Sequence, residues 1–191
     1  MLVMNFVDFK KLAIKYKTIP VYKKVLADLL TPISAYMRLE KKSKYAFILE
    51  SVEKGSRYSR YSFIGRDPEL IVRSQDGKTE TLENGVWVDN SVDFLSFLRI
   101  LCSRYNAPKL SGIPGFTGGL VGYMGYESIV WIEDIPIYDN REGDVPDALY
   151  MLYNEIIAFD HLKNQIILFS NVQINDKVNL QDVFCNAQKK I

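Results

Sequence analysis

Apolar residues recur at three- and four-residue steps in four stretches of the chain, which predicts four amphipathic helices. Each stretch is preceded by a residue type that caps helix N-termini. The predicted caps are Asn5 with Asp8, Thr31 with Pro32 at the first helical position, Ser91, and Asn179. These signals place the four helices far apart in the sequence.

Between the helices, short apolar or alternating runs bounded by turn residues predict β-strands. The predicted strands are residues 18–26, 45–52 and 60–65, a meander of three short strands turning at Asp76-Gly77 and Asn84-Gly85, and a long hairpin formed by residues 147–159 and 165–172. Because Pro20 lacks a backbone donor, the first strand is predicted to be an edge or entry strand. Short turns join most of these strands, so the predicted fold is α+β, mostly antiparallel with flanking helices, rather than a doubly wound parallel sheet.

A glycine-rich segment, residues 116–126, interleaves glycines with apolar and aromatic residues. A dinucleotide-binding loop requires Gly-x-Gly-x-x-Gly in a βαβ unit, and neither that spacing nor a following acidic residue in such a unit is present. The glycines therefore indicate close backbone packing and no bound cofactor. The acidic, proline-containing residues 133–146 are predicted to form a mobile loop.

Composition narrows the class of protein. The 191 residues are 48% hydrophobic and 25% charged, which predicts a folded soluble chain of one domain or two small ones. A net charge of +1 argues against a nucleic-acid partner, and no apolar run is long enough to span a membrane. Cys102 and Cys185 lie apart without metal-ligand spacing, so we expect a reducing, cytoplasmic location.

Catalytic constellations are scarce. The single histidine, His161, falls at the tip of the predicted hairpin, where an exposed and solvated imidazole is the ordinary interpretation. No Ser-His-Asp or Cys-His arrangement, phosphate-binding loop or metal-ligand cluster is suggested. The chain alone does not look like a complete enzyme.

One segment carries binding chemistry. Leu49, Glu50 and Ser51 end a predicted strand, and Arg60 begins the next. A zwitterion would find Glu50 for its ammonium, Arg60 for its carboxylate and Ser51 for either group. The ordinary alternative is a solvated strand end with a Glu-Arg ion pair on the surface.

Five segments in order resemble the N-terminal region of anthranilate synthase component I. They are IPVY at 19–22, DLLTPISAY at 28–36, FILESVE at 47–53, RYSFIG at 60–65 and FTGGLVGYMGYE at 116–127. A small departure is Ile48, where the family commonly has leucine. The sister family, aminodeoxychorismate synthase component I, shares this architecture and is the first alternative; a non-enzymatic binding or scaffold module is the second.

The resemblance implies a lyase of tryptophan biosynthesis that converts chorismate to anthranilate and pyruvate, with Mg²⁺ and with ammonia from a glutamine amidotransferase subunit, component II. Residues 1–191 would form its N-terminal regulatory region. The C-terminal region that handles chorismate and magnesium is absent, so no catalytic residue or metal ligand is assigned and the isolated chain is expected to be inactive. The resemblance also implies an allosteric site for feedback inhibition by L-tryptophan at Leu49, Glu50, Ser51 and Arg60.

Overall fold

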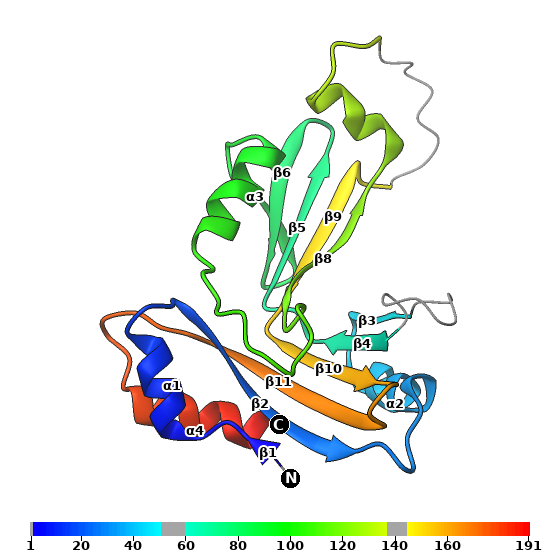
Figure 1. Ribbon diagram of the computed structural model, residues 1–191. Helices are drawn as coiled ribbons and strands as arrows, with labels where there is room; N and C mark the ends of the chain where they lie inside the picture. Colours follow the sequence, from blue (N-terminus) through cyan, green and yellow to red (C-terminus); the bar gives the residue numbers. More distant parts are fainter. Residues whose placement is uncertain (1, 51–59, 137–144) are drawn as a thin grey trace. The chain divides into compact units, whose positions relative to one another are not determined.

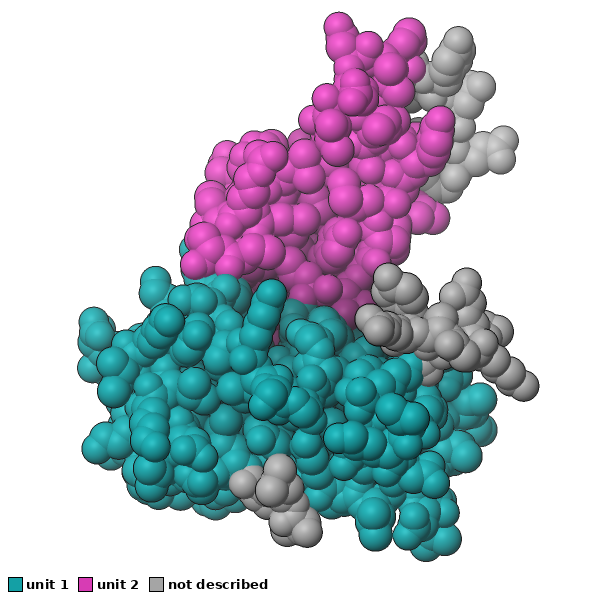
Figure 2. Space-filling view, viewed as in Figure 1, with its two compact units in different colours: residues 1–68, 104–119, 153–191 teal, residues 69–103, 120–152 magenta. Residues whose placement is uncertain are grey.

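A computed structural model describes residues 2–50, 60–136 and 145–191. The chain folds as two compact units, coloured separately in Figure 2. Unit 1 comprises residues 1–68, 104–119 and 153–191, and unit 2 comprises residues 69–103 and 120–152. Each unit contains one sheet, and all strand pairs with a defined register are antiparallel. The predicted α+β class is confirmed.

Unit 1 is built on a six-stranded sheet in the order β1-β2-β11-β10-β4-β3 (Figure 1). Its strands are β1 (Leu2–Val3), β2 (Thr18–Leu26), β3 (Ala46–Leu49), β4 (Tyr61–Arg66), β10 (Glu155–Asp160) and β11 (Gln165–Gln173). Its helices are α1 (Phe6–Ala13), α2 (Pro32–Leu39), the 3-10 helix η1 (Glu40–Lys42) and α4 (Leu180–Lys190).

Helices cover one face of this sheet. Figure 1 shows α1 and α4 side by side along β2 and β11, where Phe9 and Phe184 pack against Ile19. Helix α2 covers the other end of the same face, with Ala35 against Ile64. Burial of these apolar side chains is the main stabilisation of the sheet.

The opposite face of the sheet is crossed by the irregular segment that leads to β8. The amide of Asn171 on β11 donates to the carbonyl of Thr117 at 2.7 Å. Phe116 packs edge-on against Phe63 of β4, with ring centroids 5.3 Å apart. The amine of Lys24 on β2 donates to the carbonyl of Gly112. Side-chain contacts therefore fix this segment without a strand ladder.

Unit 2 contains a five-stranded sheet in the order β7-β6-β5-β9-β8. Its elements are β5 (Leu70–Gln75), β6 (Lys78–Glu83), β7 (Val86–Asp89), α3 (Phe94–Ser103), β8 (Gly119–Met124), the 3-10 helix η3 (Tyr126–Trp131) and β9 (Ala148–Tyr153). The predicted meander at β5 to β7 is confirmed, with positive φ at both residues of each predicted turn. Val72, Phe94 and Ala148 form its core with Trp131 and Tyr150.

Three details of the sequence prediction were wrong. Residues 147–159 are two strands in different sheets, β9 and β10, separated at Asn154, whose carbonyl accepts the backbone N–H of Asn171. Strand β2 is not an edge strand, since β1 pairs with Lys23 and Lys24; Pro20 is tolerated because it lies beyond that short contact. The cap of α3 is Asp93 rather than Ser91.

The glycine-rich segment packs as predicted. A side chain at Gly122 would overlap the carbonyl oxygen of Leu149 and the Cα of Tyr150 on β9. Gly119 differs, because it has open space but a φ of +135°, a backbone conformation that L residues rarely adopt. Of the predicted mobile loop, residues 137–144 lie outside the described residues. No helix in the described part of the chain is long and apolar enough to cross a membrane.

Candidate functional site

Three of the four predicted site residues are described, and they lie at the end of β3 and the start of β4. Leu49 is the last residue of β3 and pairs with Phe63 of β4. Glu50 follows directly, and Arg60 precedes β4. Ser51, the fourth predicted residue, lies outside the described residues. The antiparallel pairing of β3 and β4 thus brings the strand end and the arginine to the same region of unit 1.

Alternation along the strands divides these residues between two faces of the sheet. Leu49 shares a face with Phe63, the one crossed by the segment that carries Phe116. Glu50 lies on the other face, where its carboxylate is 3.3 Å from the hydroxyl of Ser62, a group that can donate to it. A ligand that contacted both Leu49 and Glu50 would therefore lie across the strand end rather than over one face.

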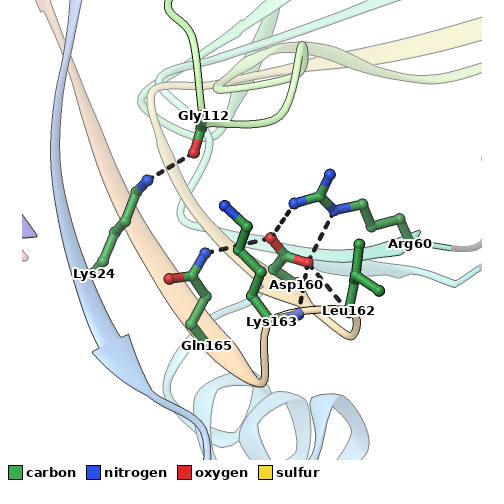
Figure 3. Close-up of polar contacts among 7 residues, drawn as sticks. All are labelled: Lys24, Arg60, Gly112, Asp160, Leu162, Lys163 and Gln165. Carbon is green, nitrogen blue, oxygen red and sulfur yellow. Dashed lines mark hydrogen bonds and ion pairs between the residues drawn. The ribbon is translucent and has the colours of Figure 1, made fainter.

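Arg60 is paired with Asp160 and not with Glu50. Its Nε donates to one carboxylate oxygen at 3.0 Å and its Nη2 to the other at 2.7 Å (Figure 3). Asp160 is the last residue of β10 and its side chain is fully buried, whereas the side chain of Arg60 keeps 31% of its exposure. A guanidinium has five N–H donors, so donors remain for a second anion.

Asp160 also closes the β10–β11 hairpin. Its carboxylate accepts the backbone N–H groups of Leu162 and Lys163, each at 3.2 Å, and the side-chain amide of Gln165 at 3.3 Å (Figure 3). Burial, the largest single influence, opposes ionisation, but the hydrogen bonds from Arg60, Gln165 and Lys163 together outweigh it and hold the pKa of Asp160 below its usual range. The hydrogen bond between Arg60 and Asp160 also raises the pKa of the Arg60 guanidinium.

An aromatic row borders Arg60. The Arg60 guanidinium lies over the ring of Tyr61, 4.9 Å from its centroid, and the Tyr61 and Phe63 rings are 6.0 Å apart. The pKa of the Tyr61 phenol is raised, and burial of the ring is the largest cause. Phe63 also pairs with the half-exposed Leu49, so the aromatic row lies beside the apolar end of β3.

The environment of His161 was mispredicted. His161 lies at the hairpin tip and is exposed as expected, but its Nε2 is 2.7 Å from the hydroxyl of buried Ser62. Its backbone N–H also donates to the carbonyl of Arg60. The β4–β10 pairing creates these contacts between residues about a hundred positions apart, so no local pattern in the sequence indicates them.

Asp160 and His161 also line a hollow of about 650 Å³ beside residues 27–32. A second hollow, of about 160 Å³, lies under α2 and the end of α4 and is lined mainly by apolar side chains such as Leu39, Ile64 and Leu168. Neither hollow is lined by Leu49, Glu50 or Arg60. Among residues 2–50, 60–136 and 145–191, no three His, Cys, Asp or Glu side chains are grouped to hold a metal.

No family model matches the chain. Among curated proteins, anthranilate synthase component 1 of Acetivibrio thermocellus is 34% identical over 185 residues, and that of Synechocystis sp. is 36% identical over 194 residues. These alignments cover 96% and 98% of this chain and 37% of each relative. The chain is homologous to the N-terminal part of anthranilate synthase component 1. The resemblance of the five segments is thereby confirmed.

A solved structure agrees. Anthranilate synthase component I from Streptococcus pneumoniae matches with a TM-score of 0.52 and 26% identity, over 88% of this chain and 36% of that one. The chain thus spans little more than a third of the length of the anthranilate synthase relatives it matches.

Proposed function

We propose that this chain is the regulatory N-terminal part of an anthranilate synthase, which converts chorismate and ammonia to anthranilate and pyruvate. The observation that carries the proposal is sequence identity of 34–36% to anthranilate synthase component 1 over nearly the whole chain. The relatives' name favours this enzyme over aminodeoxychorismate synthase, the sister alternative. A component 2 subunit that delivers ammonia is the partner expected for a component 1 protein.

Within this function, residues 49–51 and Arg60 form part of a site for the inhibitor L-tryptophan. Three features of the described residues support this assignment. Leu49 and Phe63 offer apolar surface to an indole, Glu50 is an exposed carboxylate that attracts an ammonium, and Arg60 is a guanidinium held in place by Asp160 with donors to spare. Asp160 neutralises part of the charge of Arg60. Arg60 therefore contributes to ligand binding more by directional hydrogen bonds than by long-range attraction.

A feedback assay tests the tryptophan site. In a protein that also carries the chorismate-converting region, Ser51→Phe should release inhibition while turnover stays nearly unchanged, because a bulky ring fills the site away from the chemistry. The measurement is anthranilate formation, followed by fluorescence, during a tryptophan titration of the wild type and the variant. Equal inhibition of both proteins would make residues 49–51 an ordinary strand end.

The 191-residue chain alone should form no anthranilate. Proton transfer, magnesium binding and contacts to the chorismate carboxylates require groups that the resemblance assigns to the C-terminal region. The check is ammonia-dependent anthranilate fluorescence with the purified chain, beside a mock preparation. Activity above the mock would overturn this part of the proposal. Tryptophan binding without activity would separate a regulatory region from a scaffold module that binds no amino acid.

A further inference from the structure

We propose that Asp160 and His161, adjacent residues at the tip of the β10–β11 hairpin, are positioning residues that hold the two charged groups of the amino-acid site. Asp160 orients Arg60, and His161 acts on Glu50 through Ser62. The inference rests on the proposed function for the identity of the ligand. It adds a regulatory property, namely that charging of His161 weakens binding of an ammonium at Glu50.

Successive side chains point to opposite faces of the sheet at the end of β10. This explains how two adjacent residues reach both Arg60 and, through Ser62, Glu50. Asp160 pairs with Tyr61 and shares its face, where the two-point contact fixes the guanidinium of Arg60. His161, the next residue, contacts Ser62 on the opposite face. The carboxylate of Asp160 accepts five hydrogen bonds from four of the described residues, three of which belong to the hairpin, so the geometry of the site depends on the hairpin.

Ser62 connects His161 to Glu50. Its hydroxyl is 2.7 Å from Nε2 of His161 and 3.3 Å from the carboxylate of Glu50, and the residue is only 2% exposed. A hydroxyl has one proton to donate. When Nε2 of His161 is unprotonated, it accepts that proton at the shorter distance, and the carboxylate of Glu50 remains available to an ammonium.

Protonation of His161 reverses this chain of hydrogen bonds. The cationic imidazole donates from Nε2 to Ser62, and Ser62 must then direct its own proton to Glu50. That hydrogen bond and the positive charge behind it then compete with the ammonium of the ligand for the carboxylate of Glu50. By linkage, a ligand ammonium at Glu50 disfavours charging of His161 to the same extent.

Other charged groups lie around the hairpin tip. Among the described residues they are Glu50 at the end of β3, Arg60 before β4, Asp160 and Lys163 in the hairpin, Lys24 on β2, and Asp28 in the segment that lines the same hollow. Arg60 and Asp160 largely cancel as an ion pair. Of the remainder, Glu50 is the group joined to His161 by hydrogen bonds through Ser62.

The first experiment measures binding of L-tryptophan to the chain by calorimetry at about pH 7.5 and about pH 5.5, a range in which imidazoles ordinarily change charge and carboxylates do not. Wild type should bind about threefold or more weakly at the lower pH, the effect of one added charge several ångströms away in a water-like dielectric. His161→Gln should remove this dependence, and the neighbouring variant Leu162→Ala should retain it. A pH dependence that survives in His161→Gln, or is absent from wild type, overturns the inference.

Ligand analogues separate positioning from general damage to the fold. Tryptamine lacks the carboxylate and should bind Asp160→Asn as it binds wild type, while L-tryptophan should lose about tenfold. Indole-3-propionate lacks the ammonium and should show no weakening at low pH. Equal losses of all three ligands in Asp160→Asn would make Asp160 merely structural. His161→Gln, altered at an exposed tip, keeps the inference testable if Asp160→Asn fails to fold.

Failure of the proposed function is recognised independently. If wild type binds none of the three ligands at either pH, the tryptophan site is wrong. The inference is then decided by the ¹⁵N signals of the single histidine. Contact with Ser62 should place the proton of the neutral ring on Nδ1, and Ser62→Ala should move it towards Nε2. An unchanged tautomer ratio would overturn the contact on which the inference depends.

Discussion

The two units contain strand pairs of different sequence separation, although β5 of unit 2 also pairs with β9 about 80 positions later. In unit 2, β5, β6 and β7 follow one another through two-residue turns. In unit 1, β2 pairs along its nine residues with β11, which begins about 140 residues later. Local pairing forms quickly and is visible in the sequence, whereas long-range pairing must first overcome the entropy of loop closure.

The units also differ in how they use buried polar groups. Unit 1 has a carboxylate, Asp160, that is fully buried and accepts five hydrogen bonds from described residues at the candidate site. The corresponding ion pair of unit 2, Arg73 with Glu80, joins cross-strand neighbours that both remain partly exposed. The comparison teaches that the candidate site lies where strands distant in sequence meet, and the following changes test each side of the comparison.

The largest effect is expected in unit 2 at Gly122. Valine there would overlap the backbone of β9 at Leu149 and Tyr150, and backbone cannot move aside as a flexible side chain does. We expect Gly122→Val to cost about 3 kcal/mol of unfolding free energy. Urea unfolding measures the loss. Gly115→Val is the control, because a side chain at Gly115 meets nothing within 4 Å; an equal effect in both would contradict the packing explanation.

The two ion pairs give the next largest effect. Asp160→Asn removes the negative charge that Arg60 and the hairpin amides bind, and it should lower the free energy of unfolding by about 2 kcal/mol. This loss is smaller than that for breaking a fully buried ion pair, because Arg60 is partly exposed. Glu80→Gln should cost less than about 1 kcal/mol, as for pairs near the surface. Both losses are read from urea unfolding at neutral pH. Equal losses would remove the energetic distinction between the units.

Acid should sharpen the same distinction. The pKa of Asp160 is lower in the folded chain than in the unfolded one, so its stabilisation is complete above the unfolded value and is lost as the pH falls through the folded value. Between about pH 5 and about pH 2, the free energy of unfolding should therefore fall more for wild type than for Asp160→Asn. The difference between the two losses should not exceed about 2 kcal/mol, which is the expected cost of the substitution at neutral pH. Parallel curves for the two proteins would show that Asp160 does not titrate with folding.

Sequence patterns predicted helix caps and turns better than they predicted which strands pair. The turns at Asp76-Gly77 and Asn84-Gly85, and the caps at Asn5, Thr31 and Asn179, were predicted correctly because each depends on neighbouring residues. The division at Asn154 was missed because β9 and β10 are both apolar, and only the two separate sheets distinguish them.

The candidate site shows the same limit. Side-chain chemistry singled out Glu50 and Arg60 but not their partners. Ser62 contacts Glu50 across a strand pair. His161 and Asp160 reach Ser62 and Arg60, which lie 99 and 100 positions earlier, only because β4 and β10 are paired. One local signal was available, since an aspartate followed by a polar tip is typical of a carboxylate that caps a turn. It would have marked Asp160 as buried and bonded, but not as the partner of Arg60.

The smallest effect concerns a local signal that was misassigned. Ser91 was predicted to cap α3, but it has a φ of +53° and its backbone N–H donates to the side chain of Asp89. Asp93 instead accepts the backbone N–H of Ser96 at 2.8 Å, and hydrogen bonds from Ser96 lower the pKa of Asp93. Asp93→Ala should therefore lower the free energy of unfolding, Asp93→Asn should lower it much less, and Ser91→Ala should leave it nearly unchanged. Urea unfolding of the three variants is the measurement. A loss in Ser91→Ala equal to that in Asp93→Ala would return the cap to Ser91. It would also mean that the observed hydrogen bond between Asp93 and Ser96 does not carry the stability of the helix.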